Sequence, residues 1–194
     1  MSVPKGLEPA ASVPAHATMS PDEAKFKELV LYVAQQCETD PAFGATKLNK
    51  ILFYADFSSY LRRGKPITGV AYRHLKWGPA PRILPSIKEE LEKRSEAREK
   101  EVPYPTGTQK RLVPFRQPDL SKFSAEEISL VDEIIRWLWG KRAEEVSDLS
   151  HLETGWRITS EGEDIPYETV ILDDRAPSHD AIAWAKAQSE ARRS

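Results

Sequence analysis

The fold is decided by the stretch KLNKILFYADFSSYLRR, residues 47–63. We predict a helix here, with Thr46 as its N-cap and Gly64 as the residue that ends it, because threonine satisfies free N–H groups at a helix start and glycine readily adopts the left-handed conformation that closes a helix. The apolar side chains lie on two faces: Leu48, Ile51, Leu52, Ala55 and Leu61 on one, and Phe53, Phe57 and Tyr60 on the other. A helix that is apolar around most of its circumference packs on several sides, so we expect it at the centre of the domain.

A capping pattern predicts another helix before this one. Ser20 can act as the N-cap, Pro21 suits the first helical position, and Glu23 completes a capping box. Apolar residues then recur at helical spacing, which extends the predicted helix to about Gln36.

Three more helices are predicted downstream. One runs from Arg82 to about Lys100, and its charged second half is interpreted as a solvated extension. Another starts at Ser124, which forms a capping box with Glu127 and is followed by an apolar stripe. A short one covers residues 143–151.

Two short strands complete the predicted fold. Residues 71–77 alternate apolar and polar side chains, and residues 107–116 supply the second strand, which Pro114 restricts to a sheet edge. Residues 151–172 are expected to be mostly irregular. The predicted fold class is therefore mainly α with a small β component (α+β): a compact, single-domain helical fold with a short two- or three-stranded sheet.

Composition sets the domain limits and the compartment. Of 194 residues, 40% are hydrophobic and 30% charged, which suffices for one cored domain, here placed at residues 20–175. We expect residues 1–19, which are interrupted by prolines, to be a disordered leader, and residues 176–194 to be a tail that can form a helix. With a single cysteine, Cys37, no intramolecular disulfide forms, which fits the cytoplasm. No run approaches the roughly 20 apolar residues of a membrane span, so no membrane partner is expected.

The sequence offers no catalytic or metal-binding pattern. Neither a nucleophile elbow nor a phosphate-binding glycine loop is present, and Asp56 is interpreted as a buried, hydrogen-bonded carboxylate rather than a catalytic acid. We therefore expect no enzyme activity, no cofactor and no metal. The histidines are too scattered for a ligand set: His16, His74, His151 and His179.

A segment rich in aromatic and basic residues is the candidate partner-binding site. Tryptophan, tyrosine and arginine dominate the energetics of protein interfaces. Trp77 lies beside a Gly-Pro turn and is either exposed for binding or packed on the central helix. The predicted partner-binding residues are Tyr72, His74, Lys76, Trp77 and Arg82.

The same segment admits nucleic acid as an alternative partner. Basic residues interleaved with aromatics can hold phosphates and stack bases. They are Arg62, Arg63, Lys65, Arg73, Lys76 and Arg82 near Tyr72 and Trp77. Against this, the formal net charge is −2 and no convincing helix-turn-helix is found, so the sequence favours a protein partner.

Two blocks of sequence resemble the Panacea domain, a family that includes SocA-like antitoxins and GepA-type prophage-associated proteins. The first block is Lys47-Leu-Asn-Lys-Ile-Leu-Phe-Tyr-Ala-Asp-Phe57, then the Gly64–Gly69 turn, then Trp77-Gly78-Pro79. The second is Leu149-Ser150-His151, then Trp156, then Ile165-Pro166-Tyr167. The resemblance covers roughly residues 22–172. Ala80 stands where family members more usually have valine.

The resemblance implies an antitoxin that neutralises a cognate protein toxin, encoded next to it, by direct binding. It leaves open an adaptor that delivers the toxin to a AAA+ protease, and a nucleic-acid-binding regulator is a further alternative. The motif residues themselves are interpreted as fold determinants, and the oligomeric state stays open.

Overall fold

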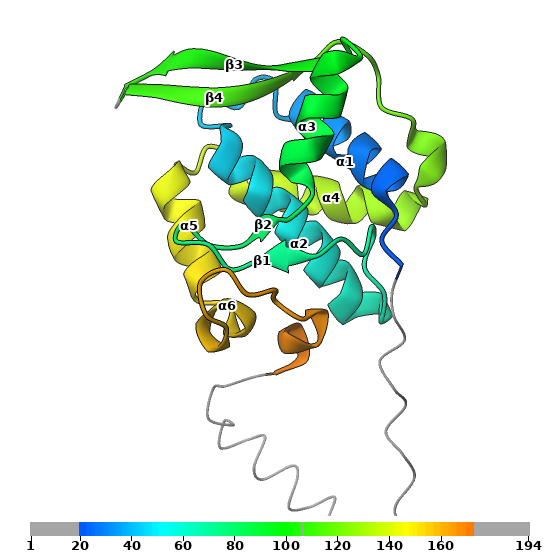
Figure 1. Ribbon diagram of the computed structural model, residues 1–194, viewed down its shortest axis with the longest axis vertical. Helices are drawn as coiled ribbons and strands as arrows, with labels where there is room; N and C mark the ends of the chain where they lie inside the picture. Colours follow the sequence, from blue (N-terminus) through cyan, green and yellow to red (C-terminus); the bar gives the residue numbers. More distant parts are fainter. Residues whose placement is uncertain (1–19, 106, 173–194) are drawn as a thin grey trace, which may run out of the picture.

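Helix α2 (Ala45–Arg63) runs through the middle of the molecule (Figure 1). The computed structural model describes residues 20–105 and 107–172. Buried side chains occur around the whole circumference of α2 between Lys47 and Ser59, as the sequence predicts. Four helical elements pack against it: α1 (Glu23–Gln36), α4 (Ala125–Leu138), α5 (Ala143–His151) and the 3₁₀ helix η2 (Tyr167–Ile171).

A buried carboxylate on α2 fixes the chain that follows the helix. Asp56 is fully buried and accepts hydrogen bonds from the backbone N–H and the hydroxyl of Thr68, at 2.7 and 2.6 Å. The Tyr72 hydroxyl lies 2.8 Å from both Asp56 Oδ2 and the Leu52 carbonyl oxygen. Burial raises the pKa of Asp56, and these hydrogen bonds oppose the rise. The interpretation of Asp56 as a structural carboxylate is confirmed.

A second carboxylate joins three helices at one end of the bundle. Glu127 accepts from Lys25 of α1 at 2.8 Å and from Arg63 of α2 at 3.1 Å. It also accepts from the backbone N–H of Ser124, whose hydroxyl accepts from the Glu127 N–H, so the predicted capping box of α4 is confirmed. The helix predicted at residues 143–151 is confirmed as α5.

The β component consists of two separate antiparallel pairs. Strand β1 (Tyr72–Arg73) pairs with β2 (Ala80–Pro81), and β3 (Ala97–Tyr104) pairs with β4 (Gly107–Pro114) along its whole length. The chain around Asp164 makes a further bridge to Arg73 on the free side of β1. The predicted α+β fold class is confirmed, although the strand expected at residues 71–77 shortens to two residues because a turn begins at Leu75.

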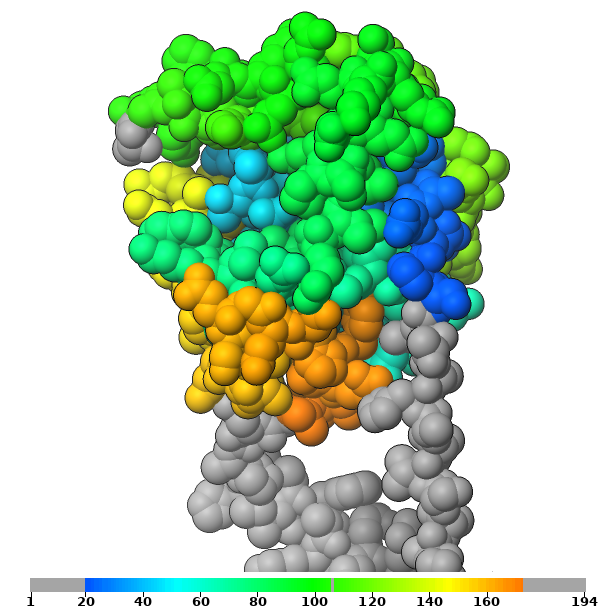
Figure 2. All heavy atoms as spheres, in the orientation of Figure 1, coloured from blue at the N-terminus to red at the C-terminus, as the bar shows by residue number. Residues whose placement is uncertain are grey.

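The charged segment after residue 93 was predicted as helix, and this is wrong. Helix α3 (Leu84–Lys93) is closed by Ser95, two residues after its last residue, a non-glycine residue with φ +56°. The Ser95 and Glu96 N–H groups donate to the carbonyls of Glu92 and Leu91, the Schellman pattern that closes a helix. The chain beyond turns back as β3, and the β3–β4 hairpin lies at the opposite end of the molecule from η2 (Figures 1 and 2).

Two predicted helix starts and one predicted core residue are also wrong. Asp22, not Ser20, caps α1, because its side chain accepts from the backbone N–H three residues on. Helix α2 begins one residue before Thr46, which therefore lies inside it, while Gly64 ends it in the left-handed conformation as predicted. Leu61 is 56% exposed instead of buried.

The remaining elements are short. The 3₁₀ helix η1 (Leu120–Lys122) precedes α4, and α6 (Thr154–Ile158) interrupts the region predicted to be mostly irregular. The predicted leader and the predicted tail both lie outside the described residues. Among the residues that are described, no helix is long and apolar enough to cross a membrane.

We expect Asp56→Asn to destabilise the protein by about 1–3 kcal/mol, because the amide nitrogen would face hydrogen-bond donors inside the core. Urea unfolding followed by far-UV circular dichroism measures the loss. Glu133→Gln is the control, since the Glu133–Arg62 ion pair is about half exposed on both sides and its loss should leave the midpoint nearly unchanged. Equal midpoints for the two variants would contradict the assigned role of Asp56.

Candidate partner-binding site

The connection between β1 and β2 passes beside α5 and α6 (Figure 1), and it contains an exposed tryptophan, Trp77. We call residues 75–79 the Trp77 turn. The Trp77 side chain is 63% exposed, and the Lys76 ammonium lies 4.9 Å from its ring centroid. Of the two alternatives left open by the sequence, burial against the central helix is therefore excluded.

Hydrogen bonds from three helices hold the backbone of the Trp77 turn. Lys50 Nζ of α2 donates to the Pro79 carbonyl at 2.9 Å, and Ser147 Oγ of α5 donates to the Trp77 carbonyl at 3.3 Å. Trp156 Nε1 of α6 donates to the carbonyl of Leu75 at 3.2 Å. Residues far apart in the sequence thus fix one surface turn, and none of the three was predicted for this role.

Glycine is required at the centre of the turn. Gly78 has φ +89°, a conformation that other residues rarely adopt. A Cβ atom there would lie 2.2 Å from Ser150 Oγ and 2.7 Å from Lys50 Nζ. Gly78 of the first sequence block therefore packs directly against Ser150 of the second block.

An aromatic stack joins α5 and α6 to the chain that leads into the turn. The Trp156 ring lies between the rings of His74 and His151, with centroid distances of 4.4 and 4.0 Å and near-parallel planes. His74 Nδ1 also lies 3.2 Å from the Thr159 hydroxyl. The histidine of the second block therefore supports the fold, as interpreted from the sequence.

Two titratable groups beneath the turn are shifted by burial. Burial lowers the pKa of Lys50 to about 7. Burial, and next the positive charge of Lys50, lower the pKa of His151. Both shifts favour the uncharged forms of these two side chains.

The five residues predicted to bind a partner do not form one surface. Tyr72 is only 1% exposed and belongs to the core around Asp56, so it cannot contact a partner. Lys76 and Trp77 are exposed together, and His74 is half-buried behind them. Arg82 is exposed and pairs with Asp164 at 2.6 Å. Partner binding by these four stays a prediction.

Half of the basic residues that suggested nucleic acid are paired with carboxylates. Three of the six form ion pairs: Arg62 with Glu133, Arg63 with Glu127 and Arg82 with Asp164. A phosphate-binding surface needs cations free to replace the counterions of the backbone. The arrangement therefore supports a protein partner over nucleic acid.

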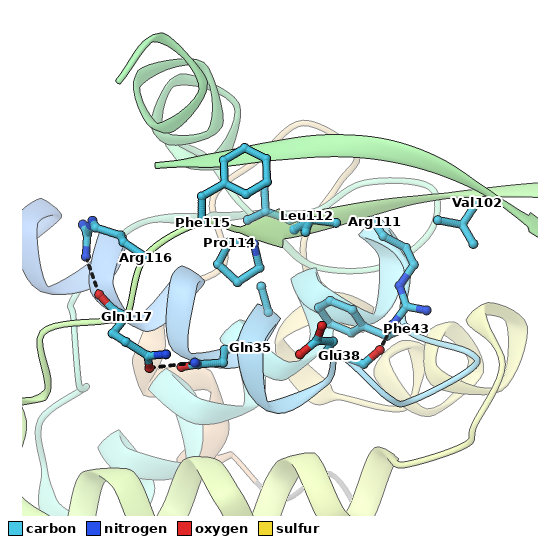
Figure 3. Close-up of a pocket in the computed structure, with 12 residues that line it drawn as sticks. Gln35, Glu38, Phe43, Val102, Arg111, Leu112, Pro114, Phe115, Arg116 and Gln117 are labelled. Atoms are coloured by element: carbon cyan, nitrogen blue, oxygen red, sulfur yellow. Dashed lines mark hydrogen bonds between the residues drawn. The ribbon is translucent and has the colours of Figure 1, made fainter. Parts of the chain in front are cut away.

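A hollow of about 550 Å³ lies under the β3–β4 hairpin (Figure 3). Its polar groups are used within the fold. Arg111 donates to the carbonyls of Cys37, Glu38 and Asp40 at 2.9–3.0 Å and so satisfies the C-terminal end of α1. Its aliphatic and aromatic lining includes Phe43, with the Arg111 guanidinium 5.7 Å from the ring centroid. The Arg111 hydrogen bonds at this hollow connect the hairpin to the end of α1.

Within residues 20–105 and 107–172, no group of three or more histidine, cysteine or acidic side chains could hold a metal ion. The one cysteine, Cys37, is buried.

Comparison with known families identifies the domain. The family model described as "Antitoxin SocA-like, Panacea domain" matches residues 48–157. The chain belongs to this family. The matched region contains the three residues whose side chains donate to the Trp77 turn, Lys50, Ser147 and Trp156. No curated protein and no solved structure matches the chain. Membership in a SocA-like antitoxin family supports an antitoxin role and favours binding over catalysis.

The pKa of Lys50 predicts a pH dependence of stability. Between about pH 7, its value in the folded state, and 10.5, its ordinary value, the unfolded chain binds one more proton than the folded chain. The free energy of unfolding therefore rises with pH in this window, by at most about 1.4 kcal/mol per pH unit from this group.

We expect Lys50→Met to remove this contribution, so that the stability difference between wild type and variant changes steadily from pH 7 to pH 10. Urea unfolding at a series of pH values measures it. The exposed Lys93 serves as control: Lys93→Met should parallel the wild type. A pH-independent difference for Lys50→Met would contradict a neutral buried lysine.

Proposed function

We propose that this protein is an antitoxin that neutralises a protein toxin by binding it directly in the cytoplasm, the compartment that a single cysteine favours. The observation that supports this proposal best is the exposed Trp77 on a turn held by three helices. The proposed interface centres on the Trp77 turn and extends over Lys76, His74 and Arg82.

Rigidity of the turn is favourable for binding. A loop that must be ordered on association loses conformational entropy, whereas a preorganised surface does not. The carbonyl groups of residues 75, 77 and 79 already accept hydrogen bonds in the free protein. An exposed tryptophan on such a surface has the character of an interface hot spot.

The interface is expected to have the size usual for specific protein complexes. A specific complex buries about 1,200–2,000 Å² in total, which is more than one turn provides. A hollow of about 380 Å³ continues the surface from Leu75 to Arg82. We therefore expect the toxin to contact both the Trp77 turn and this hollow.

Trp77→Ala is expected to weaken toxin binding by about 1–2 kcal/mol, or roughly 5- to 30-fold in Kd, because the variant loses the largest exposed aromatic group of the surface. Isothermal titration calorimetry with the purified toxin measures the change. Trp139→Ala is the matched control, since Trp139 is 43% exposed, caps α4 and does not line the hollow beside the turn. Equal affinities of both variants would show that the toxin binds elsewhere.

Co-expression tests the function itself. We expect the reading frame next to this gene to encode a protein that is toxic alone and harmless when the antitoxin is present. Pull-down of the tagged antitoxin should recover the toxin in a stable stoichiometric complex. A neighbour without toxicity would contradict the proposal.

The same experiment separates the alternative mechanisms. Rescue accompanied by a falling toxin level, reversed in a strain lacking a AAA+ protease, would indicate an adaptor rather than direct neutralisation. Binding to its own promoter with a steep salt dependence would indicate a nucleic-acid-binding regulator.

A further inference from the structure

A second surface, on the other side of α5, is open and carries several exposed apolar side chains among polar ones. Three adjoining hollows of about 710, 300 and 390 Å³ share lining residues, with Leu61 common to the first two and Leu152 to the first and third. Together they form one groove between α2, α4, α5 and the α6–η2 region. We call it the apolar groove.

The groove gathers a large part of the exposed apolar surface. Of the eleven large hydrophobic side chains exposed in the described parts of the chain, five line it. They are Leu61, Trp137, Leu152, Ile171 and Leu172, each 46–72% exposed. A contiguous apolar surface of this kind is a binding site in most soluble proteins, so something is expected to cover it.

The chain itself supplies a candidate where the description ends. Leu172 lines the groove and is directly followed by residues 173–194. This segment contains two large apolar residues, Ile182 and Trp184, within the sequence DAIAWAKAQ. From Leu172 to Trp184 the chain can span up to about 40 Å, so these two residues can reach any part of the groove.

We propose that residues 173–194 dock in the apolar groove of their own chain through Ile182 and Trp184. Docking covers Leu61, Trp137 and Leu152. The proposal concerns a different surface from the Trp77 turn and is independent of the antitoxin function.

Tethering makes even a weak contact sufficient. A short linker holds the segment at an effective concentration on the order of 1 mM, so that an intrinsic dissociation constant of about 100 µM keeps roughly nine tenths of the chains docked. The same weakness would allow a bound partner to displace the segment. With the groove covered, the Trp77 turn stays open.

Tryptophan signals in ¹⁵N-labelled full-length protein provide the test. The chain has five indole N–H groups, at Trp77, Trp137, Trp139, Trp156 and Trp184. The double substitution Ile182→Asp, Trp184→Asp places charges on the docking residues. We expect the Trp137 indole and the backbone amides of Leu61 and Leu152 to shift by more than a linewidth, while the Trp77 and Trp139 indoles stay in place.

A reciprocal variant and a matched control make the test specific. Leu152→Asp changes a side chain that is 72% exposed, so the fold should survive, and the Trp184 indole should move to the position it has in the isolated peptide 173–194. The control Ser178→Asp, Gln188→Asp adds the same charge to the segment outside its apolar pair. It should leave the groove signals unchanged.

Three outcomes would overturn the proposal. Groove signals that do not respond to Ile182→Asp, Trp184→Asp would show that the segment is not docked. Shifts that disappear on dilution would assign the occupant to a second copy of the chain. Groove signals that move only when purified toxin is added would assign the surface to the toxin.

Discussion

The structure depends on satisfying the charged groups of a helix that is buried on all sides. Lys47 and Lys50 are each only 1% exposed and Asp56 not at all. Each requires a hydrogen-bond or ion-pair partner, because a buried polar or charged group without one is destabilising. Lys47 pairs with Asp40 at 2.8 Å, Lys50 binds the backbone of the Trp77 turn, and Asp56 binds the chain after α2. These partners come from the loops, so the charges of α2 determine where the loops lie.

This constraint links the fold to the candidate site. The Trp77 turn is held at one end by a lysine of the central helix, and its Gly78 leaves no room for a side chain against Ser150. Buried polar interactions of this kind add little net stability compared with apolar packing, but they select one arrangement of the backbone. In this protein the selected arrangement exposes the Trp77 side chain to solvent.

Where the sequence could be interpreted correctly, the signals were local and unambiguous. Capping at Ser124, the left-handed Gly64 and the all-round apolar pattern of α2 each determine structure within a few residues. The end of α3 could not be predicted in this way, since Ser95 adopts a left-handed conformation usually reserved for glycine. The partner-binding role predicted for Tyr72 was wrong for another reason. Tyr72 and Trp77 are both aromatic and lie five residues apart. Tyr72 is buried because it packs against Asp56 in the folded protein, whereas Trp77 stays exposed.

The two apolar surfaces on either side of α5 differ in a way that suits different occupants. At the Trp77 turn, one aromatic ring stands on a backbone fixed by hydrogen bonds, so binding there loses little conformational entropy and gains strongly from shape complementarity. The apolar groove is lined by Trp137 and by separate leucine and isoleucine side chains, such as Leu152 after α5 and Ile171 in η2. Such a surface makes weak contacts with many kinds of apolar side chain of a ligand and discriminates poorly between different ligands. A selective partner therefore fits the Trp77 turn, while the groove suits a segment that is tethered nearby and needs only modest affinity.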